Sequence, residues 1–391
     1  MADVRVAILG AGGWMGKVHS LGYRNTALLF GGRRGSAEIA MLVDENAGRL
    51  KEMAAAIGNP RIESDWRVAV ADPDIDLIDI CLPDYLHYPV AKAALEAGKN
   101  VYCEKPFTDT AAEAKELADL ATRKGVVTRI GHNFPKNPAH EIARDLIRSG
   151  EIGDIQLFRA WMHVDVLADP AAPFMWRCDG ELAPTGAVGD IATHVFSLVD
   201  YLVGDIRTLT ADAGVTAAER PYQAGFGYGV KAGELKDAPM KAVTNPDFVN
   251  ILCRLKNGGR GVIDVSRVAT GRRFQQGYDI YGTRGALSFD YDEVNRIRFY
   301  SGADPVGRQG WRAIDAGPES ETYAAFNPVA NFGVGYNEFK AIEVSEVVNA
   351  VATGTPVWPT FHDGARLMRI VDACLKSAAE GGWVTVEGGN A

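Results

Sequence analysis

The chain has 391 residues, and 41 lysines and arginines against 50 aspartates and glutamates give it a formal net charge of −9. With 47% hydrophobic and 23% charged residues, it has the composition of a globular protein of about two or three domains. The acidic balance argues against a dedicated nucleic-acid binder. No run of about 18 apolar residues could cross a membrane. The first residues lack the basic and apolar regions of a secretory leader, so we expect a cytoplasmic protein.

The five cysteines show no pattern of a disulfide framework or a zinc cluster. Their number is odd, and none is spaced as Cys-x-x-Cys. We therefore expect most of them to be small buried hydrophobic residues. They are Cys81, Cys103, Cys178, Cys253 and Cys374.

The first part of the chain alternates between strand-like and helix-like segments. Apolar, β-branched runs predict strands at Val4–Leu9, Glu38–Val43, Asp76–Leu82, Asn100–Cys103 and Val126–Gly131. Helical spacing predicts helices at Trp14–Tyr23, Ala47–Ile57, Tyr88–Ala97 and Thr110–Lys124. This alternation indicates a parallel sheet covered on both faces. We expect an α/β domain over residues 1–133.

After about His132 the segments become turn-rich and indicate an α+β domain over residues 134–391 with an open, mostly antiparallel sheet. The predicted strands are Ile155–Met162, the hairpin Phe248–Ile263 with a turn at Asn257-Gly258-Gly259, Tyr278–Tyr281, Ala286–Phe289 and Arg296–Tyr300. The predicted helices are Ala139–Arg148, Val188–Leu202, Glu338–Ala352 and Gly364–Glu380. Residues 304–334 read as a long excursion. The last helices could pack back on the first domain.

One face of the second sheet is expected to lack a covering layer of helices. Its strands carry apolar residues on both faces, as in Ile251-Leu252-Cys253 and Tyr278-Asp279-Ile280-Tyr281. Such a face usually becomes a subunit interface. We therefore expect a homodimer or a homotetramer.

A glycine-rich loop joins the first strand to the first helix: Gly10-Ala11-Gly12-Gly13-Trp14-Met15-Gly16. In this position, glycines let the backbone approach a pyrophosphate, which the N–H groups of the helix can bind. The spacing departs from Gly-x-Gly-x-x-Gly in either register, and an ordinary turn is the alternative. We predict a Rossmann dinucleotide-binding domain with contacts from Gly10, Gly12, Gly13, Trp14 and Met15.

Asp44 ends the second strand, where a carboxylate can accept hydrogen bonds from ribose hydroxyls and repel a 2′-phosphate. Glu45 strengthens the repulsion, so NAD is favoured over NADP. Two alternatives stay open: Asp44 could instead cap the helix that begins near Ala47, and Arg33 and Arg34 could reach a 2′-phosphate.

Three further motifs carry a resemblance to a known family. They are Glu104-Lys105-Pro106, Leu82-Pro83-Asp84-Tyr85-Leu86-His87 and Gly189-Asp190-Ile191-Ala192-Thr193-His194. With the glycine loop, they resemble the family of glucose–fructose oxidoreductase, inositol dehydrogenase and rhizopine-catabolism proteins (Gfo/Idh/MocA), and the resemblance covers nearly the whole chain. The chain looks closest to members acting on inositols and on sugars such as levoglucosan, where an alcohol becomes a ketone.

The resemblance implies an NAD-dependent sugar or inositol dehydrogenase. Leu82, Pro83, His87, Glu104 and Lys105 would line the cofactor site. Asp84 stands where the family more often has Asn, so contacts to the cofactor there could differ.

Oxidation of a secondary alcohol needs a proton acceptor and a group that stabilises a developing alkoxide. We assign His194 as general base, Asp190 one turn earlier as its partner, and Lys105 as the cation that meets the reacting oxygen. The nicotinamide accepts the hydride. No metal is expected, because the histidines His87, His132, His163 and His194 are not spaced as zinc ligands.

Substrate contacts are expected from residues after the sixth strand and from the second domain. The candidates are Asn133, Lys136, His163, Trp176 and Arg177. Lys136 could equally be an exposed lysine at a helix start. His163 lies on a strand that we expect to face the cleft, and Trp176 and Arg177 could be domain scaffolding.

Two other functions remain open. One is an enzyme that keeps NAD tightly bound and recycles it, as an epimerase or glycosidase working through a transient keto-sugar. The other is a non-catalytic NAD-binding sensor. In every case the partner is a small sugar or polyol rather than a nucleic acid or a membrane.

Overall fold

The computed structural model describes residues 4–223, 235 and 237–386. The chain divides into two compact units, with residues up to 137 and 317–366 in the first and residues 138–316 and 367–391 in the second. The predicted boundary lay at 133, and residues 317–366 join the first unit. Helix α10 (Phe361–Glu380) contributes to both units.

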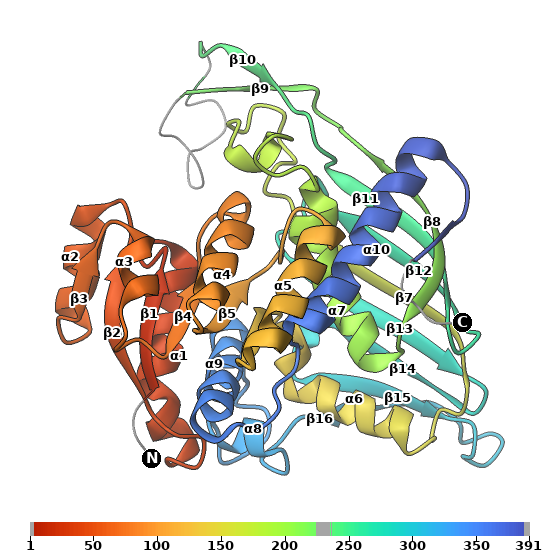
Figure 1. The fold of residues 1–391 in the computed structure, drawn as a ribbon. Coiled ribbons are helices and arrows are strands. Elements are labelled where there is room, and N and C mark those ends of the chain that lie inside the picture. The colour runs from red at the N-terminus through yellow and green to blue at the C-terminus, as the bar shows by residue number, and fades with distance from the viewer. Residues whose placement is uncertain (1–3, 224–234, 236, 387–391) are drawn as a thin grey trace. The chain divides into compact units, whose positions relative to one another are not determined.

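A parallel sheet of six strands, in the order β3-β2-β1-β4-β5-β6, forms the centre of the first unit (Figure 1). The strands are β1 Val4–Leu9, β2 Ala37–Val43, β3 Arg61–Glu63, β4 Leu77–Ile80, β5 Asn100–Glu104 and β6 Thr128–Gly131. The expected Rossmann-like sheet is confirmed. Strand β3 was not expected, because three residues with two charges carry almost no periodic signal.

Helices cover both faces of this sheet. They are α1 Trp14–Phe30, α2 Ala47–Ala56, α3 Trp66–Ala71, α4 His87–Glu96, α5 Ala111–Lys124 and α9 Tyr336–Thr353, and the short helix α8 Glu321–Ala324 belongs to the same unit. Helices α1, α2 and α9 share one apolar core with β1, in which Ile8, Tyr23 and Val344 are fully buried. Helix α1 was predicted to end at Tyr23 but continues to Phe30, where Gly31 ends it in the left-handed conformation (φ 61°).

The second unit contains a nine-stranded sheet in the order β16-β15-β14-β13-β7-β12-β11-β8-β17. The strands are β7 Ile155–His163, β8 Ile206–Gly214, β11 Phe248–Leu255, β12 Arg260–Ser266, β13 Gln275–Gly282, β14 Gly285–Asp290, β15 Arg296–Ser301, β16 Trp311–Asp315 and β17 Val384–Thr385. All neighbours are antiparallel except β7 and β12, so the mostly antiparallel sheet is confirmed. The predictions missed β8, and β16 lies within the expected excursion.

The two faces of this sheet differ. Helices α6 (Pro138–Arg148) and α7 (Thr193–Leu202) pack on the face that buries Ala160 and Tyr278. On the opposite face, Leu157 is 54% exposed and Leu252 51%. Val262 lies directly opposite Leu252 in register, so these side chains form a continuous apolar patch. No helix in the described part of the chain is long and apolar enough to cross a membrane.

A buried arginine anchors the loops beside this sheet. The Arg267 guanidinium donates to the Asp247 carboxylate (2.9 Å), to Asn245 Oδ1 (2.8 Å) and to the main-chain oxygen of Arg177 (2.9 Å). Arg267 and Asp247 are almost completely buried. The ion pair therefore ties the loop that holds Arg177 to the end of β12. The second unit also contains a separate two-stranded ribbon, formed by β9 (Glu219–Pro221) and β10 (Met240–Ala242).

We predict that Arg267→Met lowers the free energy of unfolding by about 3–5 kcal/mol, because it leaves the Asp247 carboxylate buried without its cation. Calorimetry and urea unfolding would measure the change. The control Arg308→Met alters an exposed arginine of the second unit and should leave stability within about 0.5 kcal/mol. Equal effects of the two changes would contradict this account.

Candidate active site

Glycines bring the ends of β1 and β4 together. Gly10 has φ +79°, and a Cβ there would lie 2.5 Å from the Cys81 carbonyl oxygen. A Cβ on Gly16 would lie 2.6 Å from the Ala11 Cα. Gly10 thus makes the tight turn and Gly16 permits close packing of helix and strand, which explains the unusual glycine spacing. The strand order reverses between β1 and β4, where doubly wound sheets bind their ligands.

Asp44 holds the glycine loop as well as facing the predicted ribose site. Its carboxylate accepts from the backbone N–H of Gly12 (3.0 Å) and of Asn46 (2.9 Å). The alternative in which Asp44 caps α2 is wrong, because the Asn46 side chain caps it by accepting from Arg49 N (3.0 Å). A carboxylate has further lone pairs for ribose hydroxyls, so the residues present fit an NAD adenosine.

Arg33 and Arg34 do not share this edge of the sheet. They lie in the turn before β2, whereas Asp44 follows its carboxyl end. Arg34 donates to the Ser345 hydroxyl (2.9 Å) and Arg33 lies 3.7 Å from the Glu321 carboxylate. The idea that they reach a 2′-phosphate is therefore wrong. Because α1 is longer than predicted, this turn lies at the amino end of β2, at the opposite end of the strand from Asp44.

The segments after β4 and β5 are joined by His87. Its ring is fully buried, with Nδ1 2.6 Å from Pro106 O and Nε2 2.9 Å from Leu82 O. Burial lowers the pKa of His87. His87 would therefore affect cofactor binding by positioning the segments after β4 and β5, and not by direct contact. Leu82 and Pro83 are partly exposed.

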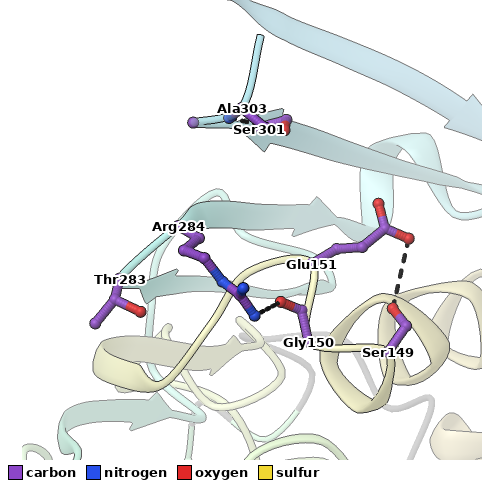
Figure 2. A pocket seen from close by; sticks show the side chains of 8 residues that line it. Ser149, Gly150, Glu151, Thr283, Arg284, Ser301 and Ala303 are labelled. Carbon is purple, nitrogen blue, oxygen red and sulfur yellow. Dashed lines mark hydrogen bonds between the residues drawn. The ribbon is translucent and has the colours of Figure 1, made fainter.

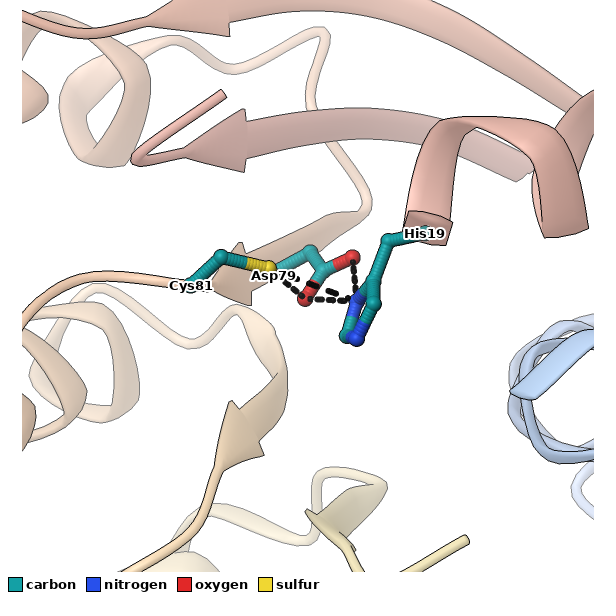
Figure 3. Close-up of side chains that lie close together, drawn as sticks. All are labelled: His19, Asp79 and Cys81. Carbon is teal, nitrogen blue, oxygen red and sulfur yellow. Dashed lines mark hydrogen bonds and ion pairs between the residues drawn. The ribbon is translucent and has the colours of Figure 1, made fainter. Parts of the chain in front are cut away.

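His19 lies between two carboxylates, that of Asp79 (Figure 3) and that of Glu104. Its Nδ1 lies 2.8 Å from Asp79 Oδ2, and its Nε2 lies 3.1 Å from Glu104 Oε1. Burial opposes the charge, but the two carboxylates raise the pKa of His19 to about 9. Cys81 Sγ lies 3.4 Å from Nδ1 and completes a metal-like trio of side chains. A ring protonated on both nitrogens has no lone pair for a metal, so we describe this cluster as an ion pair.

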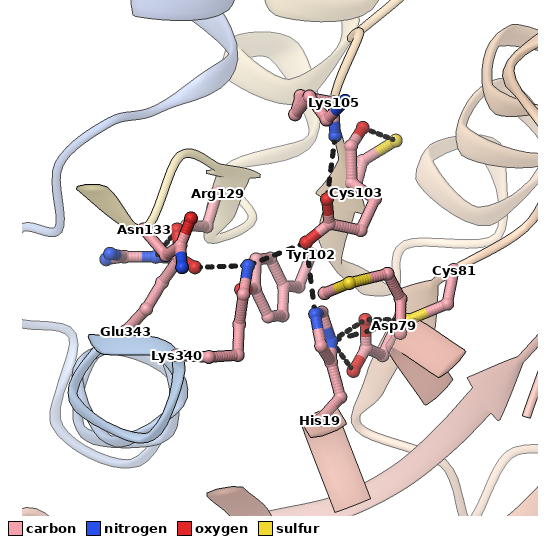
Figure 4. A network of polar contacts seen from close by, with 12 residues as sticks. His19, Asp79, Cys81, Tyr102, Cys103, Lys105, Arg129, Asn133, Lys340 and Glu343 are labelled. Atoms are coloured by element: carbon pink, nitrogen blue, oxygen red, sulfur yellow. Dashed lines mark hydrogen bonds and ion pairs between the residues drawn. The ribbon is translucent and has the colours of Figure 1, made fainter. Parts of the chain in front are cut away.

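The ion pairs continue from β5 into α9 (Figure 4). Lys340 contacts Glu104 (2.6 Å) and Glu343 (2.5 Å), and Arg129 contacts Glu343 (3.5 Å). Glu346 then accepts from Arg129 (2.9 Å) and from Lys136 (2.7 Å). The complete network alternates in sign: Lys136, Glu346, Arg129, Glu343, Lys340, Glu104, His19 and Asp79.

Most of this network was not predicted from the sequence. Its traces were present: Asp79 interrupts an otherwise apolar strand, and Lys340, Glu343 and Glu346 recur every three residues along one helix. Both patterns indicate buried polar groups that need partners.

Lys136 is not the exposed lysine that one alternative described. Its side chain is 11% exposed, its ammonium lies 5.2 Å from the centre of the Trp358 ring, and burial lowers its pKa. Asn133 is buried beside it, with Nδ2 3.5 Å from the Tyr336 carbonyl oxygen. Tyr336 also stacks on Trp14 of the glycine loop (5.2 Å between ring centres).

In the second unit, Asp190 and His194 lie where a π-helical turn, η4 (Val188–Ala192), runs into α7. A continuous α-helix was expected here. Gly189 packs so closely that a Cβ would lie 2.0 Å from the Thr185 hydroxyl. Single π turns are rare and occur often at functional sites.

Arg177 reaches Asp190 within this unit. Its Nε lies 3.5 Å from Asp190 Oδ2, and its guanidinium lies 4.1 Å from the centre of the Trp176 ring. The main-chain oxygen of Arg177 accepts from Asn245 (2.9 Å) and from Arg267 (2.9 Å). The structure therefore groups Trp176, Arg177 and Asp190, whereas Lys105 belongs to the first unit.

His163 lies apart from this group. Alternation along β7 places it on the face opposite Ala160, and therefore away from α6 and α7. Its Nε2 lies 3.0 Å from Asp264 Oδ2, and this hydrogen bond raises the pKa of His163. His163 therefore pairs with Asp264 on the sheet face opposite α6 and α7.

A shallow pocket in the second unit contains none of the predicted site residues (Figure 2). Arg284 donates to the Gly150 carbonyl, and Ser149 donates to the Glu151 carboxylate (3.4 Å). These polar groups satisfy one another, so we assign no ligand to this pocket.

Comparison with known proteins agrees with the fold and the motifs. Residues 4–132 match the oxidoreductase family with an NAD-binding Rossmann fold, and residues 140–288 match the C-terminal domain of the Gfo/Idh/MocA proteins. Levoglucosan dehydrogenase of Pseudarthrobacter phenanthrenivorans is 35% identical over 386 residues, which is 99% of each chain.

Solved structures extend the comparison. A levoglucosan dehydrogenase in complex with NADH and levoglucosan superposes with a TM-score of 0.91 at 34% identity, covering 99% of this chain and 100% of that chain. An inositol dehydrogenase homologue of Azotobacter vinelandii, complexed with NADH and myo-inositol, has a TM-score of 0.77 at 22% identity, covering 98% and 97%. At that identity the likeness shows the fold alone. The chain belongs to the Gfo/Idh/MocA oxidoreductase family, and its first domain is an NAD-binding Rossmann domain.

Proposed function

We propose that the protein oxidises a secondary alcohol of a sugar, anhydrosugar or cyclitol to a ketone, with NAD as the oxidant. The observation that carries the proposal is the 35% identity to levoglucosan dehydrogenase over 99% of both chains, in a chain that carries Lys105, Asp190 and His194. Levoglucosan is therefore the first substrate to test.

In the proposed mechanism, His194 removes the hydroxyl proton of the substrate as general base. Asp190 supports the charge that the ring gains, and the Arg177 guanidinium 3.5 Å away limits where that carboxylate can point. Lys105 donates to the reacting oxygen and stabilises its developing negative charge. NAD, when bound, accepts the hydride.

The proposed substrate contacts are Asn133, Lys136, Trp176 and Arg177. The Trp176 ring and the Arg177 guanidinium are stacked, which presents an apolar surface and hydrogen-bond donors side by side. This combination suits a sugar, which has an apolar face and hydroxyl edges. His163 is not among the proposed substrate contacts, because it lies on the sheet face opposite α6 and α7.

Two other functions predict different behaviour. An epimerase or glycosidase that recycles bound NAD would turn over substrate without net release of NADH. A sensor would bind NAD and show no turnover at all. The retention of Lys105, Asp190 and His194 together favours catalysis, because a sensor has no need of all three.

We predict net NADH formation from at least one member of a panel of levoglucosan, inositols and aldoses with NAD, followed by absorbance of the reduced cofactor. His194→Ala should lower kcat about 100-fold or more, and Lys105→Met should lower it to a similar extent.

The matched control is His362→Ala, which removes an exposed histidine at the start of α10. It should leave kcat unchanged. Full activity of His194→Ala would refute the assigned mechanism, and substrate conversion without NADH release would favour the recycling enzyme.

The position of Asp44 predicts a preference for NAD over NADP. Asp44→Asn retains an oxygen that can accept from Gly12 N and removes the charge that repels a 2′-phosphate. We expect the ratio of kcat/KM for NAD to that for NADP to fall about tenfold or more. Glu96→Gln removes an equal charge from an exposed site at the end of α4 and should leave the ratio unchanged. An unchanged ratio in Asp44→Asn would contradict the role of this carboxylate.

We further propose that the exposed face of the second sheet contacts a second copy of this chain. Leu157, Leu252, Val262 and Tyr281 form its apolar centre. Arg159 and Arg260 flank this centre together with Asp264, so the face offers both charges needed for contact with a copy of itself.

Light scattering should therefore give a mass of two or four times the 42.1 kDa of one chain, as for a homodimer or a homotetramer. Leu252→Glu places a charge in the centre of the patch and should shift the mass to that of a monomer. Val306→Glu alters a side chain that is 94% exposed in a distant turn, and should leave the mass unchanged. A monomeric wild-type protein at micromolar concentration would overturn the proposal.

A further inference from the structure

We propose that Lys340 is a positioning residue for Lys105 and acts through the carboxylate of Glu104. The inference rests on the proposed function, because it requires Lys105 to stabilise the reacting oxygen. Lys340 belongs to α9, far along the chain from the turn that it would control, but within the same compact unit.

Lys340 is completely buried, which is rare for a lysine. Its ammonium donates to Glu104 Oε1 (2.6 Å) and to the Tyr102 hydroxyl (3.1 Å), and Glu343 Oε2 lies 2.5 Å away as a second ion-pair partner. Burial alone would lower the pKa of Lys340, but the carboxylates of Glu104 and Glu343 outweigh it and raise the pKa. Lys340 is therefore a fixed cation beneath β5.

The Glu104 carboxylate connects this cation to the turn that holds Lys105. Its Oε1 faces Lys340 and His19, while its Oε2 accepts from the backbone N–H of Lys105 (3.2 Å). Burial would raise the pKa of Glu104, and the charges of Lys340 and His19 hold it well below its usual value. One carboxylate thus fixes the main chain at the base of the proposed catalytic lysine.

Gly131 shows that space is reserved for this carboxylate. Gly131 is paired with Glu104 across β5 and β6, and a Cβ on it would lie 2.3 Å from Glu104 Oε1. The carboxylate cannot move aside at low cost, because ion pairs and a main-chain N–H hold both of its oxygens. Only a glycine at this position allows Glu104 to face Lys340 and Lys105 together.

Loss of the Lys340 cation would leave two buried carboxylates with too little positive charge. Glu104 would then have to turn or take up a proton, and the backbone N–H of Lys105 would lose a well-placed acceptor. Because a misplacement of about 1 Å can cost 100-fold in rate, the turnover number should respond to Lys340 even though its own ammonium contacts Glu104, Glu343 and Tyr102.

A double-mutant cycle tests the proposal, with turnover of levoglucosan and NAD as the assay. Lys340→Met should lower kcat about 10- to 100-fold and leave KM for NAD within about threefold. In a protein that already carries Lys105→Met, the same change should lower kcat by less than about threefold, because Lys340 acts through Lys105. Multiplicative effects would overturn the proposal.

Controls separate positioning from folding. Lys92→Met removes a half-exposed lysine of α4. It should leave kcat unchanged and should show no coupling to Lys105→Met. NADH fluorescence and thermal melting check that each variant folds and binds cofactor. Where Lys340→Met does not fold, Gly131→Ala displaces the Glu104 carboxylate without removing a charge. This variant should lower kcat about tenfold or more with NADH binding retained, and an unchanged kcat would overturn the proposal.

The design also distinguishes failure of this inference from failure of the proposed function. If Lys105→Met leaves turnover unchanged, or the wild type oxidises nothing in the panel, the proposed function fails and the inference falls with it. If Lys105→Met abolishes turnover while folded Lys340→Met is fully active, only the positioning role of Lys340 is refuted.

Discussion

The first unit depends on the burial of one carboxylate, that of Glu104. A buried carboxylate is costly unless cations and hydrogen-bond donors surround it. Here the cations come from distant parts of the chain, His19 from α1 and Lys340 from α9. The glycine-loop helix, the Lys105 turn and a helix near the end of the chain must therefore assemble together. The need to compensate one charge links the elements that the proposed cofactor and lysine sites require.

Such a network is a poor device for stability alone. A buried ion pair often stabilises a protein no better than well-packed hydrophobic residues would, but it has a single satisfactory geometry. The network in the first unit ends at Lys136 on one side, and Glu104 within it accepts from the backbone N–H of Lys105; both lysines are predicted site residues. We therefore interpret it as a means of fixing positions, with a neutral sum of four cations and four carboxylates when His19 is protonated.

The sequence predicted what depends on local pattern and missed what depends on tertiary contact. Strand–helix alternation and the glycine loop were enough to predict the parallel sheet and its ligand edge. The role of Asn46 as helix cap was missed, because Asp44 and Asn46 are equally good caps by residue type. The π turn at Asp190 was also missed, since its periodicity differs little from that of an α-helix over five residues. The pairing of Glu104 with Lys340 spans 236 residues, so no local pattern could reveal it.

The second unit repeats the same physical device with different residues. The buried pair of Arg267 and Asp247 fixes the main-chain oxygen of Arg177, whose guanidinium faces Asp190. In both units, a buried ion pair holds the backbone of a predicted site residue: Lys105 in the first unit and Arg177 in the second. Folding then orders these groups in advance, so that little reorganisation remains when charge develops during the reaction. Such advance ordering gives a physical reason for burying charged residues next to the proposed site residues, although apolar residues would pack there at lower cost.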